Sequence, residues 1–326
     1  MKAITMSEFG GPEVMHLDEV ETPIAKDNEL LIRVKASSVN RPDVIQRQGN
    51  YPPPPGDSEI LGLEVAGIVE SIGQQVSRYA VGDRVVALVG GGAYAEYTVA
   101  LETHTMPVPE SVNFEQAACI CETYITAYLN LFMLGELEGK SSVLIHGGGG
   151  GVATAGLQLC KTLSPQTEIF VTASSAKIDR VKQQGADHVI DYRNQDFAVE
   201  IKQIRAKRGV DVILDHIGAK YLDQNLRSLS LGGCLMLIGV MGGIKAEINL
   251  AMMMVKRQKI IGSVLRSRPL AEKADIINRF EKTVMPLFAS GQITPLIHTT
   301  LPLSEASQAH QLMEQGGHFG KIVLCP

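Results

Sequence analysis

The chain has 326 residues, of which 45% are hydrophobic and 20% charged, a composition typical of globular proteins. The formal net charge is -5, Trp is absent and aromatic residues make up 5%, so neither a basic surface nor stacking side chains for a nucleic acid are expected. No apolar run is long enough to cross a membrane, and the first residues lack the apolar core of a signal peptide. One core rarely serves a chain of this length, so we expect two domains.

The cysteine and histidine residues indicate neither disulfides nor a metal site. The cysteines are odd in number and scattered, as Cys119, Cys121, Cys160, Cys234 and Cys325. We therefore expect a reducing, cytoplasmic location. Cys119 and Cys121 have one residue between them and no histidine nearby, so we interpret them as small buried side chains and His146 as a structural residue.

The first 120 or so residues are rich in predicted β-strands. Between Leu30 and Ala36, apolar residues alternate with Arg33 and Lys35, which is typical of a strand with one buried face. Further short strands, separated by glycine-rich turns, are expected at residues 65–72, 84–88 and 94–99. The proline run at residues 52–55 predicts a stiff surface loop.

From about residue 120 the pattern changes to alternating strands and helices. A first helix is predicted at 123–133, followed by short apolar strands at 143–146, 168–173, 188–190, 210–214, 234–238 and 259–264. Helices are predicted between them at 150–161, 176–184, 196–208 and 220–229, and the basic run 202–208 is interpreted as the solvated face of a helix. This order indicates an α/β fold with a doubly wound parallel sheet, and six strands complete a Rossmann dinucleotide-binding sheet.

The last 60 or so residues contain a predicted helix at 271–289, a strand near Ile297, a helix at 304–314 and a strand at 321–324. This segment is too small for a core of its own, so we expect it to return to the β-rich part. The predicted domains are therefore 1–120 together with 266–326, and 121–265.

The strongest single motif is VLIHGGGGGVA at residues 143–153, in which a strand leads through glycines into a helix. Apolar or small residues then follow at helical spacing, as Val152, Ala155, Gly156, Leu159 and Cys160. Glycines allow backbone N–H groups to approach a pyrophosphate, and the helix N-terminus favours its negative charge. The motif predicts a dinucleotide site, with Ala153 at a position where glycine is more usual.

The residues after the second strand of this sheet favour NADP over NAD. An NAD-binding site usually places Asp or Glu there, to accept a hydrogen bond from the ribose 2′-OH. This chain has Ser174, Ser175 and Lys177 instead, with Tyr192 following the third strand. Two hydroxyls and a cation suit a 2′-phosphate, although Lys177 and Arg180 also fit simple solvated side chains.

At this point the chain resembles a known family, the zinc-independent quinone oxidoreductases of the medium-chain dehydrogenase/reductase superfamily. The similarity covers nearly the whole chain and includes LGLEVAGIVESIG (61–73), VGDRVVAL (81–88), GADHVIDY (185–192) and GVDVILDHIG (209–218). RQGNYPPPPG (47–56) and VLRSR (264–268) are similar to the p53-inducible quinone oxidoreductase branch. The resemblance implies a GroES-like β domain with an inserted Rossmann domain, NADPH bound between them, no zinc ligands and a homodimer.

The resemblance also assigns residues to the cofactor. It places Gly150, Gly151 and Val152 at the pyrophosphate, and Ser174, Ser175, Lys177 and Tyr192 at the 2′-phosphate. Near the nicotinamide and along the rest of the cofactor it places Asn40, Thr126, Ile217, Gly239, Val240, Met241 and Leu265. It implies that His318, Phe319 and Gly320 close over the cofactor.

The expected activity is NADPH-dependent reduction of small quinones, with Tyr51 and Asn40 orienting the acceptor carbonyl through hydrogen bonds. Tyr51 also fits a rim residue packed on the proline run, and Glu64 is expected to brace the β domain. An alternative is reduction of a polarised C=C bond in an enoyl thioester or an alkenal, with Tyr51 as proton donor. A third is a non-catalytic binding protein, against which the intact cofactor motifs argue.

Overall fold

The computed structural model describes residues 1–326, which form two compact units. The first unit is Met1–Ile125 with Arg266–Pro326, and the second is Thr126–Leu265. The first boundary falls after Ile125 because the start of the next helix belongs to the first unit: the Glu122 backbone N–H donates to Glu64 Oε2 at 2.8 Å, and the Tyr124 ring packs on Phe288. No helix has the length and apolar character to cross a membrane.

The first unit is built on a seven-stranded sheet in the order β14-β15-β3-β4-β5-β7, with β6 also paired to β3. Leu30, Ile32 and Val34 of β3 are buried while Arg33 and Lys35 are exposed, which confirms the predicted alternation. The strands are β3 (Glu29–Val39), β4 (Glu64–Ile72), β5 (Arg84–Leu88), β6 (Tyr97–Leu101), β7 (Thr105–Pro107), β14 (Ile297–Pro302) and β15 (Lys321–Cys325).

The C-terminal segment joins this sheet, as predicted, because β15 pairs antiparallel with β3. Its helices are α9 (Leu270–Ala289) and α10 (Ala306–Gln315), with the turn η6 (Leu303–Glu305) before α10. Leu303, Ala306, Ala309 and Met313 pack into the core that the inner face of the sheet also lines.

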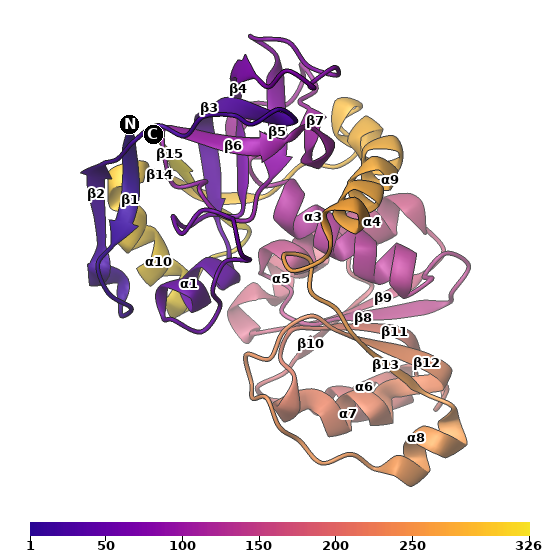
Figure 1. Ribbon diagram of the computed structural model, residues 1–326. Coiled ribbons are helices and arrows are strands. Elements are labelled where there is room, and N and C mark those ends of the chain that lie inside the picture. The colour runs from indigo at the N-terminus through magenta and orange to yellow at the C-terminus, as the bar shows by residue number, and fades with distance from the viewer. The chain divides into compact units, whose positions relative to one another are not determined.

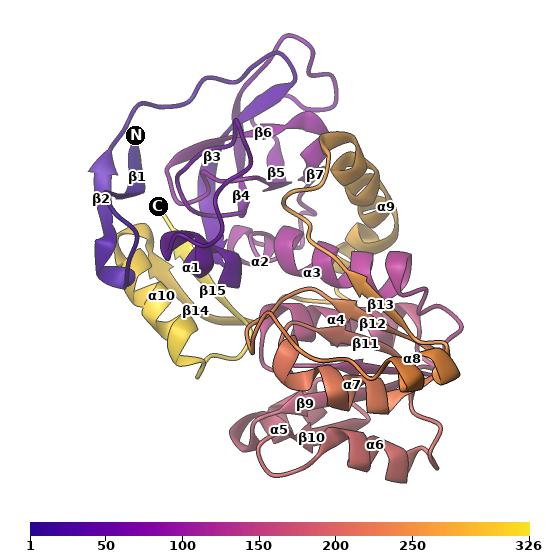
Figure 2. The same ribbon diagram turned by 60° about the horizontal axis from the view of Figure 1, so that its bottom comes forward.

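Several elements of the first unit were not predicted. They are the hairpin of β1 (Lys2–Met6) and β2 (Met15–Glu19), the short strand β7, the helices α1 (Arg41–Arg47) and α2 (Phe114–Ala117), and the turns η1 (Pro12–Val14) and η2 (Glu102–His104). Figures 1 and 2 show the hairpin beside α10. The strand predicted at 94–99 begins only at Tyr97, because the Tyr94 carbonyl accepts the N–H of Ile4 from β1.

The second unit is a parallel six-stranded sheet in the order β10-β9-β8-β11-β12-β13, which confirms the predicted Rossmann architecture. Leu144, Phe170, Ile213 and Leu235 from its inner strands are fully buried. The strands are β8 (Ser142–Ile145), β9 (Glu168–Ala173), β10 (His188–Asp191), β11 (Val210–Asp215), β12 (Leu229–Leu237) and β13 (Lys259–Gly262). The order reverses between β8 and β11, the point where such sheets bind ligands beyond their carboxyl ends.

Helices cover both faces of this sheet, with α4 and α5 on one face and α6 and α7 on the other (Figure 1). Their bounds are α4 (Gly151–Leu163), α5 (Ile178–Gln183) after the turn η4 (Ser175–Lys177), α6 (Phe197–Ile204) and α7 (Leu222–Ser228) after the turn η5 (Ala219–Tyr221). A further helix, α8 (Leu250–Lys256), was not predicted. The helix predicted at 123–133 is α3 (Cys121–Tyr128), continued by the π-helical segment η3 (Leu129–Leu134).

The interpretation of residues 202–208 as a solvated helix face is wrong for Arg205. The helix ends at Ile204, and Ala206 and Lys207 adopt left-handed backbone conformations with φ of 48° and 68°. Arg205 is only 6% exposed; it donates to Gly209 O at 2.6 Å and to Ser141 Oγ at 2.8 Å, and it pairs with Glu168. The arginine therefore ties the loop to the start of the sheet, whereas Lys207 and Arg208 are exposed.

Candidate functional site

The glycine loop between β8 and α4 packs closely against side chains of the neighbouring strands and loops. Gly147 has φ +70°, and a Cβ there would lie 2.5 Å from the His216 ring. A Cβ at Gly148 would lie 2.5 Å from Val171. Gly150 is the N-cap of α4, and no side chain caps the N-terminal N–H groups of this helix. The loop therefore leaves backbone donors for an anion and has no room for side chains at its base.

Cationic side chains gather beside this loop. Lys177 extends over it, since a Cβ at Gly149 would lie 3.0 Å from Lys177 Nζ. Burial lowers the pKa of Lys177, and the charges of Arg180 and Arg193 lower it further. Mutual repulsion among three cations is relieved when an anion binds among them, so this cluster fits a phosphate group. Arg193 was not predicted, since the motif around it points only to its neighbour Tyr192.

The serines predicted at the 2′-phosphate are placed differently from each other. Ser174 occupies the N-cap position of the turn η4, and its side chain makes no capping hydrogen bond. The Ser175 hydroxyl donates to Asp191 Oδ2 at 2.5 Å, and this hydrogen bond lowers the pKa of Asp191. Ser175 therefore directs its proton away from a phosphate. Tyr192 is 38% exposed, with the Arg193 guanidinium over its ring at 5.9 Å.

The loops after β11 and β12 meet at the same edge of the sheet. Met241 N donates to His216 O at 3.1 Å, and Gly242 N donates to Ile217 O at 2.6 Å. A Cβ at Gly239 would lie 3.1 Å from His216, so these loops are also closely packed. The two loops therefore bring together the predicted residues Ile217, Gly239, Val240 and Met241. The side chains of Val240 and Met241 are about half exposed.

Asp215 fixes the first of these loops, since it accepts the N–H groups of Ile217 at 2.7 Å and Gly218 at 3.1 Å. Burial raises the pKa of Asp215 to about 6. The other two cofactor residues predicted in this unit, Thr126 and Leu265, lie outside these loops. Thr126 is in α3, where its carbonyl accepts from Asn130, and Leu265 is the buried last residue of the unit.

In the first unit, Tyr51 follows α1 and packs against Arg266, whose guanidinium carbon is 5.2 Å from its ring centroid. Arg266 is fixed by Gly90 O at 2.8 Å, Gln46 Oε1 at 2.8 Å and Tyr51 O at 3.3 Å. Burial, and secondarily the charge of Glu122, raise the pKa of Tyr51 to about 12. Tyr51 therefore remains a neutral phenol that can donate a hydrogen bond.

Asn40 is 5% exposed, and its polar atoms are all used within the unit. Its amide nitrogen donates to Glu64 Oε1 at 2.9 Å and to Ser38 O at 3.3 Å, while its amide oxygen accepts from Lys321 Nζ at 2.5 Å. This arrangement does not support the predicted hydrogen bond from Asn40 to an acceptor. Glu64 is fully buried and pairs with Lys321 at 3.0 Å, as expected of a residue that braces the domain.

The segment predicted to close over the cofactor precedes β15. His318 and Phe319 are buried. Gly320 has φ +92°, and a Cβ there would lie 2.3 Å from the Leu296 carbonyl oxygen. Only glycine fits this turn, which sets the direction in which the segment enters the strand.

No group of three or more His, Cys, Asp and Glu side chains is arranged to hold a metal ion. Cys119 and Cys121 are fully buried, and burial raises the pKa of both thiols. His146 lies between Thr172 Oγ1 and Asn225 Oδ1, each at 2.8 Å, and burial lowers its pKa to about 3. The burial of all three side chains agrees with their interpretation as packed residues.

A cavity of about 600 Å³ in the first unit is lined by residues that include Pro54, Gly90, Arg266 and Lys273. Neither Tyr51 nor Asn40 lines it. After burial, the charges that shift the pKa of Tyr51 are those of Glu122 and Arg266. The sequence motifs gave neither residue a role.

Comparison with known proteins gives matches over both units. A model of the alcohol dehydrogenase GroES-like domain matches residues 26–110, and a zinc-binding dehydrogenase model matches residues 184–324. The chain is 35% identical to a quinone oxidoreductase of Rattus norvegicus over 99% of its own length and 97% of the relative's. It is 32% identical to a synaptic vesicle membrane protein VAT-1 homolog of Danio rerio, over 99% of this chain and 69% of the relative.

Solved structures show the same similarity. Escherichia coli quinone oxidoreductase complexed with NADPH superimposes with a TM-score of 0.90 at 28% identity, covering 100% of both chains. The CurK enoyl reductase superimposes with a TM-score of 0.87 at 25% identity, covering 99% of this chain and 98% of that one.

Proposed function

This chain belongs to the medium-chain dehydrogenase/reductase superfamily and is an oxidoreductase, and we propose that it is an NADPH-dependent, zinc-independent reductase of small quinones. The observation that carries the proposal is the glycine loop with Lys177, Arg180 and Arg193 beside it. Similarity to quinone oxidoreductases, one of them solved with NADPH, supports both the cofactor and the acceptor class.

NADPH fits the second unit at three places. The backbone N–H groups of Gly151 and Val152, at the start of α4, are the donors for the pyrophosphate, whereas the N–H of the N-cap residue Gly150 closes the loop by donating to Gly147 O at 2.8 Å. The cations beside the loop take the 2′-phosphate, with Ser174 and Tyr192 at its edge. Thr126, Leu265 and the loops with Ile217, Gly239, Val240 and Met241 hold the remainder. When bound, the reduced nicotinamide supplies a hydride to the acceptor.

The first unit supplies the groups that hold the acceptor. Tyr51 is a neutral phenol and donates a hydrogen bond to the acceptor carbonyl, which polarises it. Arg266 fixes the tyrosine ring from one side. Asn40 acts through Glu64 and Lys321 as a positioning residue, since its own amide is already bonded.

A second candidate is reduction of a polarised C=C bond in an enoyl thioester or alkenal. The structural similarity to the CurK enoyl reductase favours it. In this reaction the proton goes to the α-carbon, whereas in quinone reduction it goes to an oxygen, so the second candidate requires a donor directed at carbon, for which Tyr51 is the candidate.

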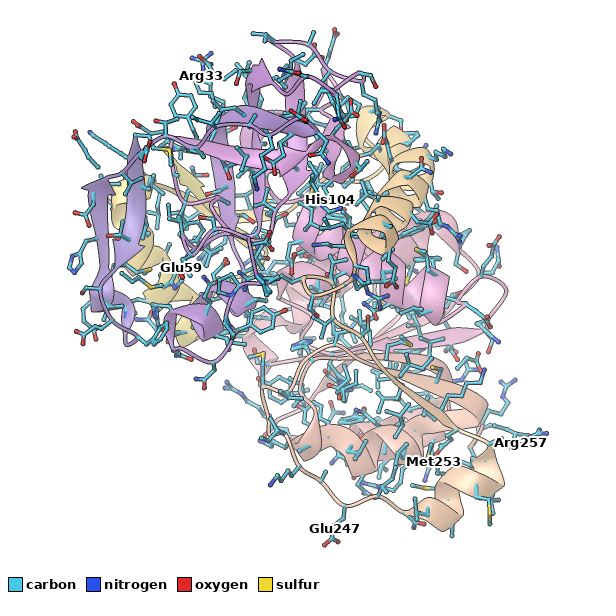
Figure 3. The ribbon with its side chains drawn as sticks, viewed as in Figure 1. Arg33, Glu59, His104, Glu247, Met253 and Arg257 are labelled. Carbon is cyan, nitrogen blue, oxygen red and sulfur yellow. The ribbon has the colours of Figure 1, made fainter.

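We also propose a homodimer in the cytoplasm. Strand β13 is the edge of its sheet and pairs only with β12. The segment between β12 and β13 carries exposed apolar side chains: Ile244, Leu250, Met254 and Val255. Figure 3 shows Glu247 on the loop before α8, Met253 on this helix and Arg257 at its end. A second copy that pairs edge to edge would cover both the free strand and this apolar surface. All five cysteines are free thiols, which suits a reducing compartment.

The experiment that tests the function follows NADPH absorbance with 1,4-benzoquinone, 9,10-phenanthrenequinone, an enoyl thioester and an alkenal in parallel. We expect fast turnover with the quinones, little with the others, and no loss after dialysis against a chelator. Turnover with only the C=C substrates would replace the first candidate by the second. Loss of activity in the chelator, restored by zinc, would contradict zinc independence.

A further inference from the structure

Asp191 is a buried acid at the edge of the proposed 2′-phosphate site, and the proposed function gives it no role. It is the last residue of β10, which pairs parallel with β9, so that Asp191 lies opposite Ala173 at the end of that strand (Figure 2). The turn η4, which carries Lys177, follows directly after β9. Asp191 is 7% exposed. The fold of the second unit therefore places a carboxyl group at the same end of the sheet as the cations of the site.

The carboxyl group of Asp191 ties two segments together. Oδ2 accepts hydrogen bonds from the Ser175 hydroxyl at 2.5 Å and from Asn194 Nδ2 at 2.8 Å, and Oδ1 accepts the backbone N–H of Arg193 at 3.1 Å. Ser175 belongs to η4, whereas the other two donors belong to the loop after β10. The hydrogen bond from Ser175, and after it that from Arg193, lower the pKa of Asp191. The group is therefore an ionised carboxylate at neutral pH.

The hydrogen bond to Asp191 determines what the Ser175 hydroxyl offers to a ligand. A hydroxyl group has one proton, and an ionised carboxylate has none, so the proton between the two groups comes from Ser175 and points at Asp191. The exposed Ser175 then presents only oxygen lone pairs to a cofactor. Lone pairs accept a hydrogen bond from the ribose 2′-OH of NADH, but they form none with a 2′-phosphate, whose oxygens are acceptors as well.

We propose that Asp191 limits the preference of this chain for NADPH over NADH, because it holds the Ser175 proton away from the 2′-phosphate and adds a negative charge beside that group. The inference rests on the proposed function, in which η4 and the loop after β10 flank the 2′-phosphate. Lys177 and its neighbouring cations favour NADPH, and Asp191 opposes part of their effect. Asp191 acts on the cofactor through Ser175 and is therefore a positioning residue that sets specificity, which is a difference between two affinities.

The first test is Asp191→Asn, which replaces one carboxylate oxygen by an amide nitrogen of similar size. The N–H of Arg193 requires an acceptor, so the remaining oxygen faces Arg193 and the new NH₂ group donates to the Ser175 oxygen. The Ser175 proton is then released toward the 2′-phosphate, while the exposed Asn194 amide turns to water. We expect the Kd for NADPH in isothermal titration calorimetry to fall about 3- to 10-fold and that for NADH to change by less than about twofold.

Ser175→Ala tests whether this gain passes through the hydroxyl group. In the wild-type background it should change the Kd for NADPH by less than about twofold, because the Ser175 proton is already used by Asp191. In the Asp191→Asn background it should remove the larger part of the gain, a non-additivity that a merely structural role of Asp191 would not produce. Asp179→Asn, which removes an exposed acid from α5, is the matched control for loss of charge and should leave both Kd values within about twofold.

Three results would overturn the inference. They are a fall of less than about threefold in the Kd for NADPH in Asp191→Asn, a gain that survives in full when Ser175→Ala is added, and a rise of more than about twofold for Ser175→Ala alone. The last result would show that the hydroxyl already donates to the phosphate, and it decides the matter even if Asp191→Asn does not fold. A wild type that binds neither NADPH nor NADH would instead refute the proposed function.

Discussion

At the residue scale, the cofactor proposal depends most on Lys177, which lies over the glycine loop among other cations. In the proposed complex, Lys177→Ala removes a charge that would face the 2′-phosphate, a group that NADH lacks. We expect the KM for NADPH to rise about 10-fold or more and that for NADH to change less than about twofold, since charge-assisted hydrogen bonds contribute roughly 1.5–3 kcal/mol. An equal rise for both cofactors in steady-state kinetics would show that Lys177 contacts a part that they share.

Arg205 shows how a residue in a basic run can be structural. Its guanidinium holds Gly209, Ser141 and Glu168 in a nearly buried position. Arg205→Ala removes the side-chain donor to Gly209 O, while Glu168 keeps His188 and Ser141 keeps Asp211, so we expect it to lower the free energy of unfolding by about 1–3 kcal/mol. The exposed neighbour Lys207 provides the comparison, and Lys207→Ala should change stability by less than about 0.5 kcal/mol in the same urea titration. Equal effects of the two changes would argue against this structural role.

At the scale of elements, the turn between β8 and α4 combines an unusual backbone angle with close packing. Gly147→Ala places a side chain at φ +70° and 2.5 Å from His216, so the loop must shift. We expect a loss of about 2–4 kcal/mol in stability and weaker NADPH binding, measured by calorimetry. Gly139 has φ +77° with nothing within 4 Å of a Cβ, so Gly139→Ala should cost only about 1 kcal/mol and leave NADPH binding unchanged. If the two variants behaved alike, packing against His216 would not matter.

Elements with a clear apolar period were predicted closely from the sequence. The strands β5 and β9 have the predicted bounds, because each is a short apolar run bounded by polar or turn residues. Helix α1 was missed because its buried face carries Asp43, Gln46 and Arg47, and no apolar stripe marks such a helix. A polar face of this kind is stabilised by partners distant in sequence, such as His310 and Tyr94, which no local pattern reveals.

The same limit applies to the candidate site. The glycine loop was predictable because strand, glycines and helix are consecutive in the chain. Arg266 and Glu122 were not assigned a role, because what distinguishes them is proximity to Tyr51 and Glu64, which lie 50 or more positions away in sequence. Asn40 was assigned to the acceptor, yet its amide is bonded to Glu64 and Lys321, and only the folded chain shows this.

At the scale of the whole molecule, the proposed dimer predicts that the edge strand β13 controls assembly. Ile261→Lys introduces a charge on this edge, where a second copy would pair, without disturbing a buried core position. We expect the wild type to sediment as a dimer and Ile261→Lys to shift toward a monomer in analytical ultracentrifugation, while the content of secondary structure stays the same. Lys245→Glu, on an exposed loop of the same unit, should remain dimeric. A monomeric wild type, or a dimeric Ile261→Lys, would place the interface elsewhere.

The titration of the buried groups determines how stability depends on pH. His146 and His310 have pKa values lowered to about 3, so below the ordinary value of 6.5 the unfolded chain binds protons that the folded chain does not, and stability is lost as the pH falls. Asp43 and Asp215 have pKa values raised from 3.8 to about 6, so their contribution is lost as the pH rises through that range. Between pH 6.5 and 8 these four groups no longer change their charge, whereas Glu122, with a pKa raised to about 8, still titrates.

Because the pKa of Glu122 is raised from 4.5 to about 8, the folded chain keeps a proton that the unfolded chain releases above 4.5. Its contribution to stability is therefore complete at low pH and is lost as the pH rises toward 8 and above. We expect the wild-type free energy of unfolding to increase by about 1 kcal/mol when the pH is lowered from roughly 8.5 to 6.5, a value reduced for partial solvent screening. Urea titrations of Glu122→Gln should show no such increase, because its amide does not titrate. An increase of the same size in this variant would mean that another group controls stability in this range.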